Sequence, residues 1–212
     1  MSGKRLWIAV LSVATMLAVS AAAQDEKNEV GGMIGRTFIS DQGIKANIPD
    51  PIIHFGKGLT FEGEYSRLFY VTPIYSIAAE GVVAYNHDID LNGGAYLSAV
   101  VPQDMKSLFV TPAARVNLFP TTAVSPWISV GAGFGRFTQS SELVYGGVNP
   151  GKSTTGFVFE GGFGLDVKVW KKLSIRGGVR DFWSSEPDFP LAPTGKTRQH
   201  NFFVGGGAFW RF

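Results

Sequence analysis

The sequence predicts an all-β protein, an eight-stranded antiparallel up-and-down transmembrane β-barrel. Three observations lead to this fold class. Apolar and polar residues alternate with a period of two in eight segments, as in strands that have one apolar face. The connections between these segments are alternately short and long. After residue 23 there is no apolar run long enough for a membrane-spanning helix, so a membrane crossing would require a closed barrel.

The N-terminal residues, 1–23, have the pattern of a cleaved secretory signal peptide. Two basic residues precede a 14-residue apolar stretch, 6–19, and small residues follow it up to Ala23. A membrane-spanning helix needs about 20 apolar residues, and the polar run that starts at Gln24 ends this stretch early. A retained anchor is the alternative. We expect cleavage after Ala23, which makes residues 24–212 a single barrel domain.

The N-terminal half is expected to supply four strands, at 29–38, 59–66, 74–85 and 108–118. The first is rich in glycine, and its pattern does not reveal which face points inward. The second sets apolar and aromatic residues against Glu62 and Glu64. The third and fourth set tyrosine, isoleucine, valine and leucine against polar faces that carry Glu80 and Arg115.

The C-terminal half is expected to supply the other four strands, at 126–137, 156–169, 173–182 and 201–212. The fifth strand alternates apolar residues with serine and glycine. The sixth has the clearest pattern, with phenylalanine, leucine and valine opposite Glu160, Asp166 and Lys168. The seventh opposes leucine, isoleucine and valine to Arg176 and Arg180.

The connections predict which rim of the barrel faces the outside of the cell. Short connections lie at 67–73, 119–125 and 170–172, and long ones at 40–57, 86–106, 139–154 and 184–200. In transmembrane barrels the short turns lie on the periplasmic rim and the long loops are extracellular. We therefore expect the four long loops to share the extracellular rim.

Alternation alone does not determine which face of each strand lines the interior. A soluble periplasmic barrel with a ligand cavity would bury its apolar face and expose its polar one. The signal peptide, the alternating loop lengths and the final strand together favour a polar interior and an apolar, lipid-facing exterior.

The final strand carries a family resemblance. One face holds phenylalanine, valine, glycine and alanine, followed by Trp210 and the last residue, Phe212. This strand, with the pattern over residues 28–212, resembles the small OmpA/OmpX-like outer-membrane β-barrels. The resemblance implies residence in the bacterial outer membrane, contact with its lipids, and recognition of Trp210 and Phe212 by the barrel-assembly machinery. It implies a structural, adhesive or narrow-pore role. No peptidoglycan-binding domain follows the barrel in this sequence, so the wall-tethering role of longer relatives is not expected.

A polar interior would collect charges of both signs. The expected members are Glu62, Glu64, Glu80, Arg115, Glu160, Asp166, Lys168, Arg176 and Arg180. An eight-stranded barrel is just wide enough for side chains to fill it, and unpaired charges in such a space are strongly destabilising. We expect a polar plug of ion pairs that holds the barrel together. A gated narrow pore made by rearrangement of the same residues is the alternative.

Composition excludes several classes of function. Without Lys4 and Arg5 of the signal peptide, 17 of the 19 basic residues remain against 17 acidic ones, so the mature chain is close to neutral. No basic stripe favours nucleic acid as a partner. The chain has no cysteine, which excludes disulfides and thiolate metal sites.

The segment 146–153 matches the phosphate-binding pattern G-x-x-x-x-G-K-S. That pattern binds a nucleotide only where the loop follows a buried strand and opens a helix. Here the residues that follow alternate as a strand, and Pro150 with its neighbouring glycines is typical of a turn. We expect no nucleotide.

A barrel enzyme that modifies outer-membrane lipid is the alternative from another class. His54, His87 and His200 fall in or beside the long loops, and Ser184 and Ser185 lie in the last of them. The chain lacks the His-x-Ser arrangement of the lipid A deacylases. We expect solvated histidines and no catalytic residue, metal site or cofactor. The alternative requires Ser184 or Ser185, His200 and a carboxylate to converge.

The long loops carry the remaining functional expectation. The first holds Ile48, Ile52, Ile53 and Phe55 among prolines, and the last holds Phe189 and Leu191. We expect these residues to pack on one another as a cap, the alternative being contact with a surface ligand. The second loop continues the alternation into an Asn-Gly turn, which predicts a hairpin. Aromatic residues near strand ends, including Trp127, Trp170, Trp183 and Trp210, are expected in interfacial girdles.

Overall fold

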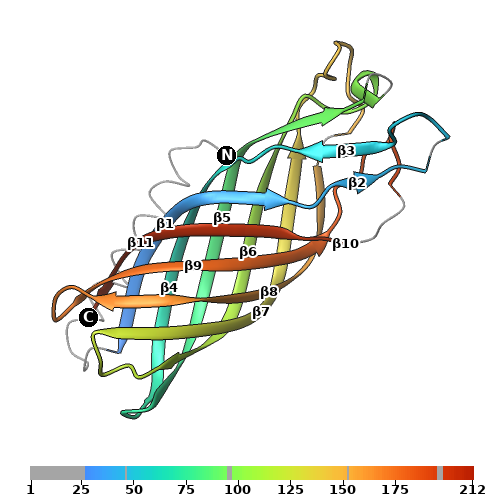
Figure 1. Ribbon diagram of the computed structural model, residues 1–212. Helices are drawn as coiled ribbons and strands as arrows, with labels where there is room; N and C mark the ends of the chain where they lie inside the picture. The colour runs from blue at the N-terminus through green and yellow to red at the C-terminus, as the bar shows by residue number, and fades with distance from the viewer. Residues whose placement is uncertain (1–26, 46, 95–96, 152, 195–197) are drawn as a thin grey trace, which may run out of the picture.

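The protein forms a closed β-barrel (Figure 1). The computed structural model describes residues 27–45, 47–94, 97–151, 153–194 and 198–212. The wall strands are β1 (Asn28–Ile39), β4 (Leu59–Val71), β5 (Tyr75–Gly93), β6 (Asp104–Leu118), β7 (Val124–Gln139), β8 (Ser153–Lys168), β9 (Leu173–Ser185) and β11 (Asn201–Arg211). The predicted signal peptide lies outside the described residues.

All wall pairings are antiparallel and follow the chain order, and β1 pairs with β11 to close the ring. The predicted eight-stranded up-and-down barrel is therefore confirmed. Closure leaves no unpaired edge in the wall, which satisfies the backbone groups of the strands. In the described part of the chain, no helix is long and apolar enough to cross a membrane.

The outer and inner faces follow the predicted assignment. Ile34, Val130 and Phe163 face outward and are 58%, 68% and 62% exposed, whereas Glu62 on the inner face is 3% exposed. A polar interior with an apolar exterior fits a lipid environment and excludes the soluble alternative. The first strand, whose faces the sequence left undecided, turns Glu29 inward.

Most strands run beyond their predicted ends, and the largest difference lies in the predicted loop 86–106. β5 continues to Gly93, and Ile89 pairs with Met105 of β6 beyond an irregularity in the register. β5 and β6 thus form a hairpin, but the predicted Asn-Gly turn is wrong, because Asn92 and Gly93 remain in β5 and pair with β3. A 3-10 turn, η2 (Leu97–Ala99), lies between β5 and β6. Three short strands, β2 (Gln42–Gly43), β3 (Ile52–Phe55) and β10 (Arg198–Gln199), lie in the other predicted loops.

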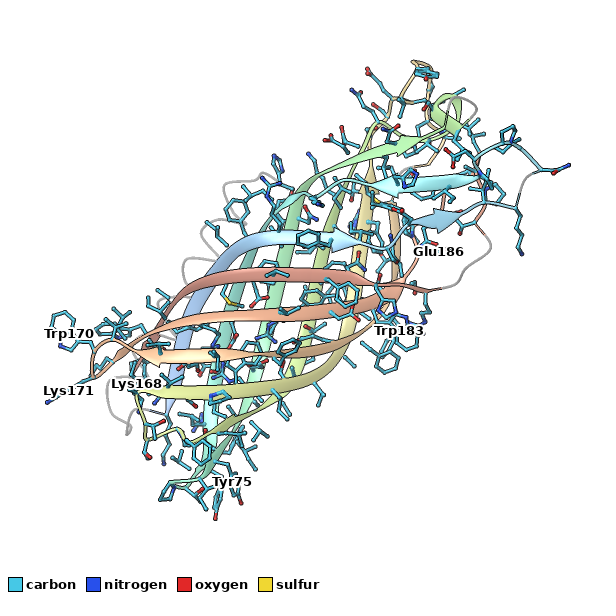
Figure 2. All side chains as sticks on the ribbon, in the orientation of Figure 1. Tyr75, Lys168, Trp170, Lys171, Trp183 and Glu186 are labelled. Carbon is cyan, nitrogen blue, oxygen red and sulfur yellow. The ribbon has the colours of Figure 1, made fainter. Side chains whose placement is uncertain are left out.

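Aromatic residues mark both ends of the outer wall. Trp170 and Tyr75 lie at the end with the short turns, and Trp183 lies near β10 at the opposite end (Figure 2). Trp210 is 50% exposed on the outer face of β11. Phe212 continues the seam, because its N–H donates to the Asn28 carbonyl at 2.8 Å and its carbonyl accepts from Asn28 N–H at 3.0 Å. Recognition of these two residues during assembly stays a prediction.

Candidate functional site

The periplasmic half of the barrel interior holds a network of ion pairs around Arg115 and Arg176. Arg115 donates to Glu64 at 2.6 Å and to Glu29 at 2.8 Å. Arg176 donates to the same two carboxylates at 2.6 and 2.7 Å and to Asp166 at 2.6 Å. Both arginines are at most 1% exposed. The carboxylates therefore offset the large desolvation penalty of two buried guanidinium groups.

Arg180, four residues after Arg176 on β9, is the centre of a second set of contacts. Its guanidinium donates to Glu62 at 3.2 Å, to Glu80 at 2.9 Å and to Glu64 at 2.8 Å, and it also contacts Glu160. Glu64 thus joins both sets, because it accepts from all three buried arginines. The network connects side chains from β1, β4, β5, β6, β8 and β9 across the interior, so it links distant parts of the wall.

Trp127 fills the space beside these arginines. The prediction that it belongs to an interfacial girdle is therefore wrong. It is 1% exposed, and the guanidinium carbons of Arg176 and Arg180 lie 5.6 and 4.9 Å from its ring centroid. A Cβ at Gly178 or Gly164 would lie only 2.5 or 2.8 Å from Trp127 Cζ2, so glycine at these positions makes room for the indole. The ring face offers the two cations an attractive, non-ionic neighbour.

Lys168, a predicted member of the network, also needs correcting. Its side chain is exposed at the end of β8, and its Nζ donates to the carbonyl of Pro120 at 2.7 Å. The position is on the inner face by alternation, but the strand has already reached the rim. There Lys168 lines a shallow hollow with Asn117, Asp166 and Arg211. The other eight predicted residues are buried in the interior.

The extracellular half of the interior contains an apolar layer next to buried, uncharged polar side chains such as Asn86, Ser107 and Asn201. Phe109 stacks on Phe182 with ring centroids 4.8 Å apart and meets Phe137 edge-on at 5.7 Å. Val82, Ala84, Val158 and Phe203 complete this layer and are at most 1% exposed. The aromatic geometries are the favourable ones for ring pairs, so this layer is a conventional core enclosed by the wall.

The four predicted long loops interlock above this layer in a closed ring. The first contacts the second through β3–β5 pairing and the last through the Ile44–Thr194 bridge. The second contacts the third through the Pro102–Leu143 bridge. The third contacts the last where Gln139 Nε2 donates to the Asp188 carbonyl at 2.5 Å. We call this assembly, residues 40–57, 86–106, 139–154 and 184–200, the cap.

The cap has its own apolar core, which is continuous with the layer below. Its fully or nearly buried members are Ile53, Phe55, Ile89, Leu91, Leu97, Val101, Met105, Phe189 and Ala192. The rings of Phe55 and Phe189, from the first and last loops, lie 6.3 Å apart. The predicted packing is therefore observed for most of these loop residues, with Leu191 and Ile52 as exceptions at 46% and 38% exposure.

Ser184 and His200, two of the residues that the enzyme alternative requires, lie on opposite faces of the wall, and the Ser185 hydroxyl donates to the Phe157 carbonyl at 3.5 Å. Ser184 lies on the inner face, where it accepts from Asn201 Nδ2 at 3.0 Å. His200 lies outside, paired with Asp181 at 2.7 Å and stacked between Trp183 and Phe202. His54 pairs with Asp41 at 2.8 Å. Within the described ranges, no three histidine or carboxylate side chains are arranged to hold a metal ion.

Within the segment 146–153, whose residue 152 lies outside the described residues, Gly146 and Gly147 have positive φ angles of 87° and 106°, as in a turn. The chain then enters strand β8. The helix N-terminus that a phosphate-binding loop requires is therefore replaced by a strand in this part of the structure.

Two interior residues were missed by the sequence reasoning, Glu29 and Trp127. Glu29 lies on the glycine-rich first strand, where few large side chains mark the faces. Trp127 was assigned from its position near a strand end, although it shares the alternation of Ser129, an inner-face residue. That alternation was the available signal.

Comparisons with known proteins agree with this architecture. A family model described as an outer membrane protein beta-barrel domain matches residues 9–212. Among solved structures, Neisserial surface protein A is similar with a TM-score of 0.52 and 13% identity, covering 87% of this chain and 97% of that one. OprG from Pseudomonas aeruginosa has a TM-score of 0.51 and 11% identity, with coverage of 89% and 98%.

The N-terminal β-barrel domain of Pseudomonas aeruginosa OprF has a TM-score of 0.50 and 11% identity, covering 89% of this chain and all of that domain. At these identities the likeness concerns the fold alone. No curated protein matches the sequence.

Proposed function

Because the chain belongs to the family of outer membrane β-barrel domains, we propose that it is a non-conducting structural barrel that presents its cap as a surface-interaction module. It is an integral protein of the bacterial outer membrane. The single observation that carries the proposal is the closed ring of interlocked loops with a shared core. Binding residues are disproportionately found on surface loops that a rigid scaffold holds in position.

The interior supports the non-conducting part of this proposal. An ion passing through would have to displace the buried arginines and then cross the stacked Phe109–Phe182 layer. Displacing the arginines would leave buried charges without their ion-pair partners. Crossing the phenylalanine layer would separate packed rings, and an apolar constriction also opposes the entry of water.

The outer surface of the cap supports the interaction part. Tyr145 and Val148, on the third loop, are 68% and 83% exposed, and Ile52 on the first loop is 38% exposed. Apolar side chains held on an ordered surface lose little conformational entropy on binding. The expected contact is thus with another macromolecular surface outside the cell.

Two measurements test the proposal. In planar bilayers the purified protein is expected to give no channel steps. Cells that display it are expected to adhere to epithelial monolayers or to one another, and a Tyr145→Ser, Val148→Ser double variant is expected to adhere less. Equal adherence of wild type, double variant and cells without the protein would contradict the interaction role.

A narrow pore is the second candidate, and the hollow at the periplasmic mouth favours it. Asn117, Asp166, Lys168 and Arg211 line this hollow, so it reaches Asp166, a member of the buried network. Reproducible channel steps that change in Arg180 variants would favour the pore over the closed barrel.

A further inference from the structure

The outer wall near the cap carries a row of stacked rings. Phe159 and Trp183 lie with centroids 5.8 Å apart, Trp183 and His200 at 6.0 Å, and His200 and Phe202 at 5.5 Å. Phe38 of β1 is the register partner of Phe202. The row therefore crosses four strands, β8, β9, β11 and β1, at one height, and we call it the aromatic strip.

Cationic side chains lie on this strip. The Arg198 guanidinium carbon is 5.3 Å from the centroid of Trp183 and 5.7 Å from that of Phe159. The Lys57 Nζ is 5.2 Å from the centroid of Phe38. Arg36 lies beside Lys57 and donates to its carbonyl at 2.8 Å. Both ends of the strip thus present a cation held on an aromatic face.

The carboxylate that faces the strip is engaged. Asp181 Oδ2 lies 2.7 Å from His200 Nδ1, which fixes the imidazole flat between Trp183 and Phe202. Arg198 Nη1 donates to the Phe157 carbonyl at 3.3 Å, and a guanidinium carries five N–H donors in all. The strip therefore combines net positive charge with a rigid apolar support.

Its position in the membrane decides the kind of partner. Trp183 projects from the wall beside β10, at the end of the barrel that carries the cap (Figure 2). Interfacial aromatic residues sit at the level of lipid head groups. On the extracellular side of a bacterial outer membrane those head groups belong to phosphorylated glycolipids.

We propose that the aromatic strip binds a phosphate of an outer-leaflet glycolipid, with Arg198 as the main phosphate ligand and Lys57 as the second. The planar guanidinium can meet two phosphate oxygens at once. The rings below it exclude water from one side and contact the first carbons of the acyl chains. The two cations of this site come from the first and last loops of the cap, whereas Tyr145 and Val148, the variant positions of the adhesion test, lie on the third loop. The lipid site and the adhesive role can therefore be tested separately.

The test is a titration of the folded protein in detergent with diphosphoryl lipid A, followed by native mass spectrometry. Arg198→Gln is expected to bind about tenfold more weakly, because it removes a charge-assisted contact. Trp183→Leu, which keeps the charge, is expected to bind a few-fold more weakly because the support for Arg198 is lost. Lipid A without its phosphates is expected to bind wild type no better than it binds Arg198→Gln.

The matched control is Arg136→Gln. Arg136 is also an exposed, outward-facing arginine near the cap, but it lies on β7, which contributes no ring to the strip, and it donates to Ser153 Oγ at 3.4 Å. Its replacement is expected to leave lipid A affinity unchanged. Equal loss in Arg136→Gln and Arg198→Gln would overturn the proposal, as would equal binding of phosphate-free lipid A by wild type.

The folding of each variant is checked by comparing unboiled and boiled samples on SDS gels. Arg198→Lys is expected to recover part of the lipid A affinity, because it keeps the positive charge but loses the planar guanidinium. Heparin serves as a soluble polyanion probe. If Arg198→Gln impairs heparin binding while lipid A binds all variants alike, the strip is a site for a soluble polyanion and the lipid proposal is wrong.

Discussion

The two halves of the barrel interior are filled by opposite kinds of side chain. Toward the short turns, buried arginines and carboxylates pair across the lumen, whereas toward the cap a stacked phenylalanine core takes their place. Along the inner face of β9, Arg176 and Arg180 are followed by Phe182. The same wall tolerates either filling, because its strands supply the backbone hydrogen bonds and the interior only has to be packed and paired.

The largest effect is expected from breaking the charged half at its centre. Arg180→Met removes the common partner of Glu62, Glu64, Glu80 and Glu160, and the free energy of unfolding is expected to fall by about 3–5 kcal/mol. Urea unfolding of the barrel in detergent, followed by gel mobility, measures the loss. The exposed Arg136→Met is the control, and a loss no larger than that of the control would contradict the network's role.

A slightly smaller effect is expected from opening the apolar half. Phe109→Ala removes a ring that contacts both Phe182 and Phe137, and the expected loss is about 3 kcal/mol. Phe109→Leu keeps most of the volume and is expected to lose clearly less. If the two variants are equally unstable in the same urea assay, ring stacking rather than volume governs this layer.

A third variant separates the cap from the barrel. Phe189→Ala removes the partner of Phe55 and is expected to destabilise the cap by about 2 kcal/mol while the wall keeps its stability. Trypsin is then expected to cleave faster at Lys45 and Lys57, with the heat-modifiable mobility of the barrel unchanged. If the variant loses both the protease resistance of the cap and the heat-modifiable mobility of the barrel, cap and barrel unfold as one unit.

The smallest effect is expected at the rim. Lys168→Gln breaks an exposed bond to the Pro120 carbonyl, and the expected loss is below about 1 kcal/mol. Arg176→Gln, eight positions later on the neighbouring strand, serves as the buried counterpart and is expected to lose several times more. Equal losses would place Lys168 within the network after all.

Alternation predicted the wall well because each crossing strand separates lipid from lumen, and a one-residue error would expose charge to lipid. Alternation failed where the two faces of a strand no longer differ clearly in side chains or in surroundings. On β1 the glycines leave both faces nearly bare, so Glu29 was not recognised as an inner residue. At Lys168 the alternation is intact, but the side chain has left the enclosed part of the barrel.

The candidate sites were less predictable than the fold. Trp127 follows the inner-face pattern, yet aromatic residues near strand ends suggest a girdle, and only the glycines of neighbouring strands reveal the space that it fills. The ring of loop contacts and the aromatic strip depend on which loops meet in space. The spacing of residues in the sequence could not predict the contact between Ile44 and Thr194 or the one between Arg198 and Trp183.

The position of Glu29 has a consequence for how the chain reaches its folded state. It accepts from Arg211, 182 residues away, and from Arg176, 147 residues away, so two of its three arginine partners come from the opposite end of the chain. These contacts can form only when the first and last strands meet. Closure of the barrel therefore coincides with the dehydration of these charges, and we expect the β1–β11 seam to form late in folding.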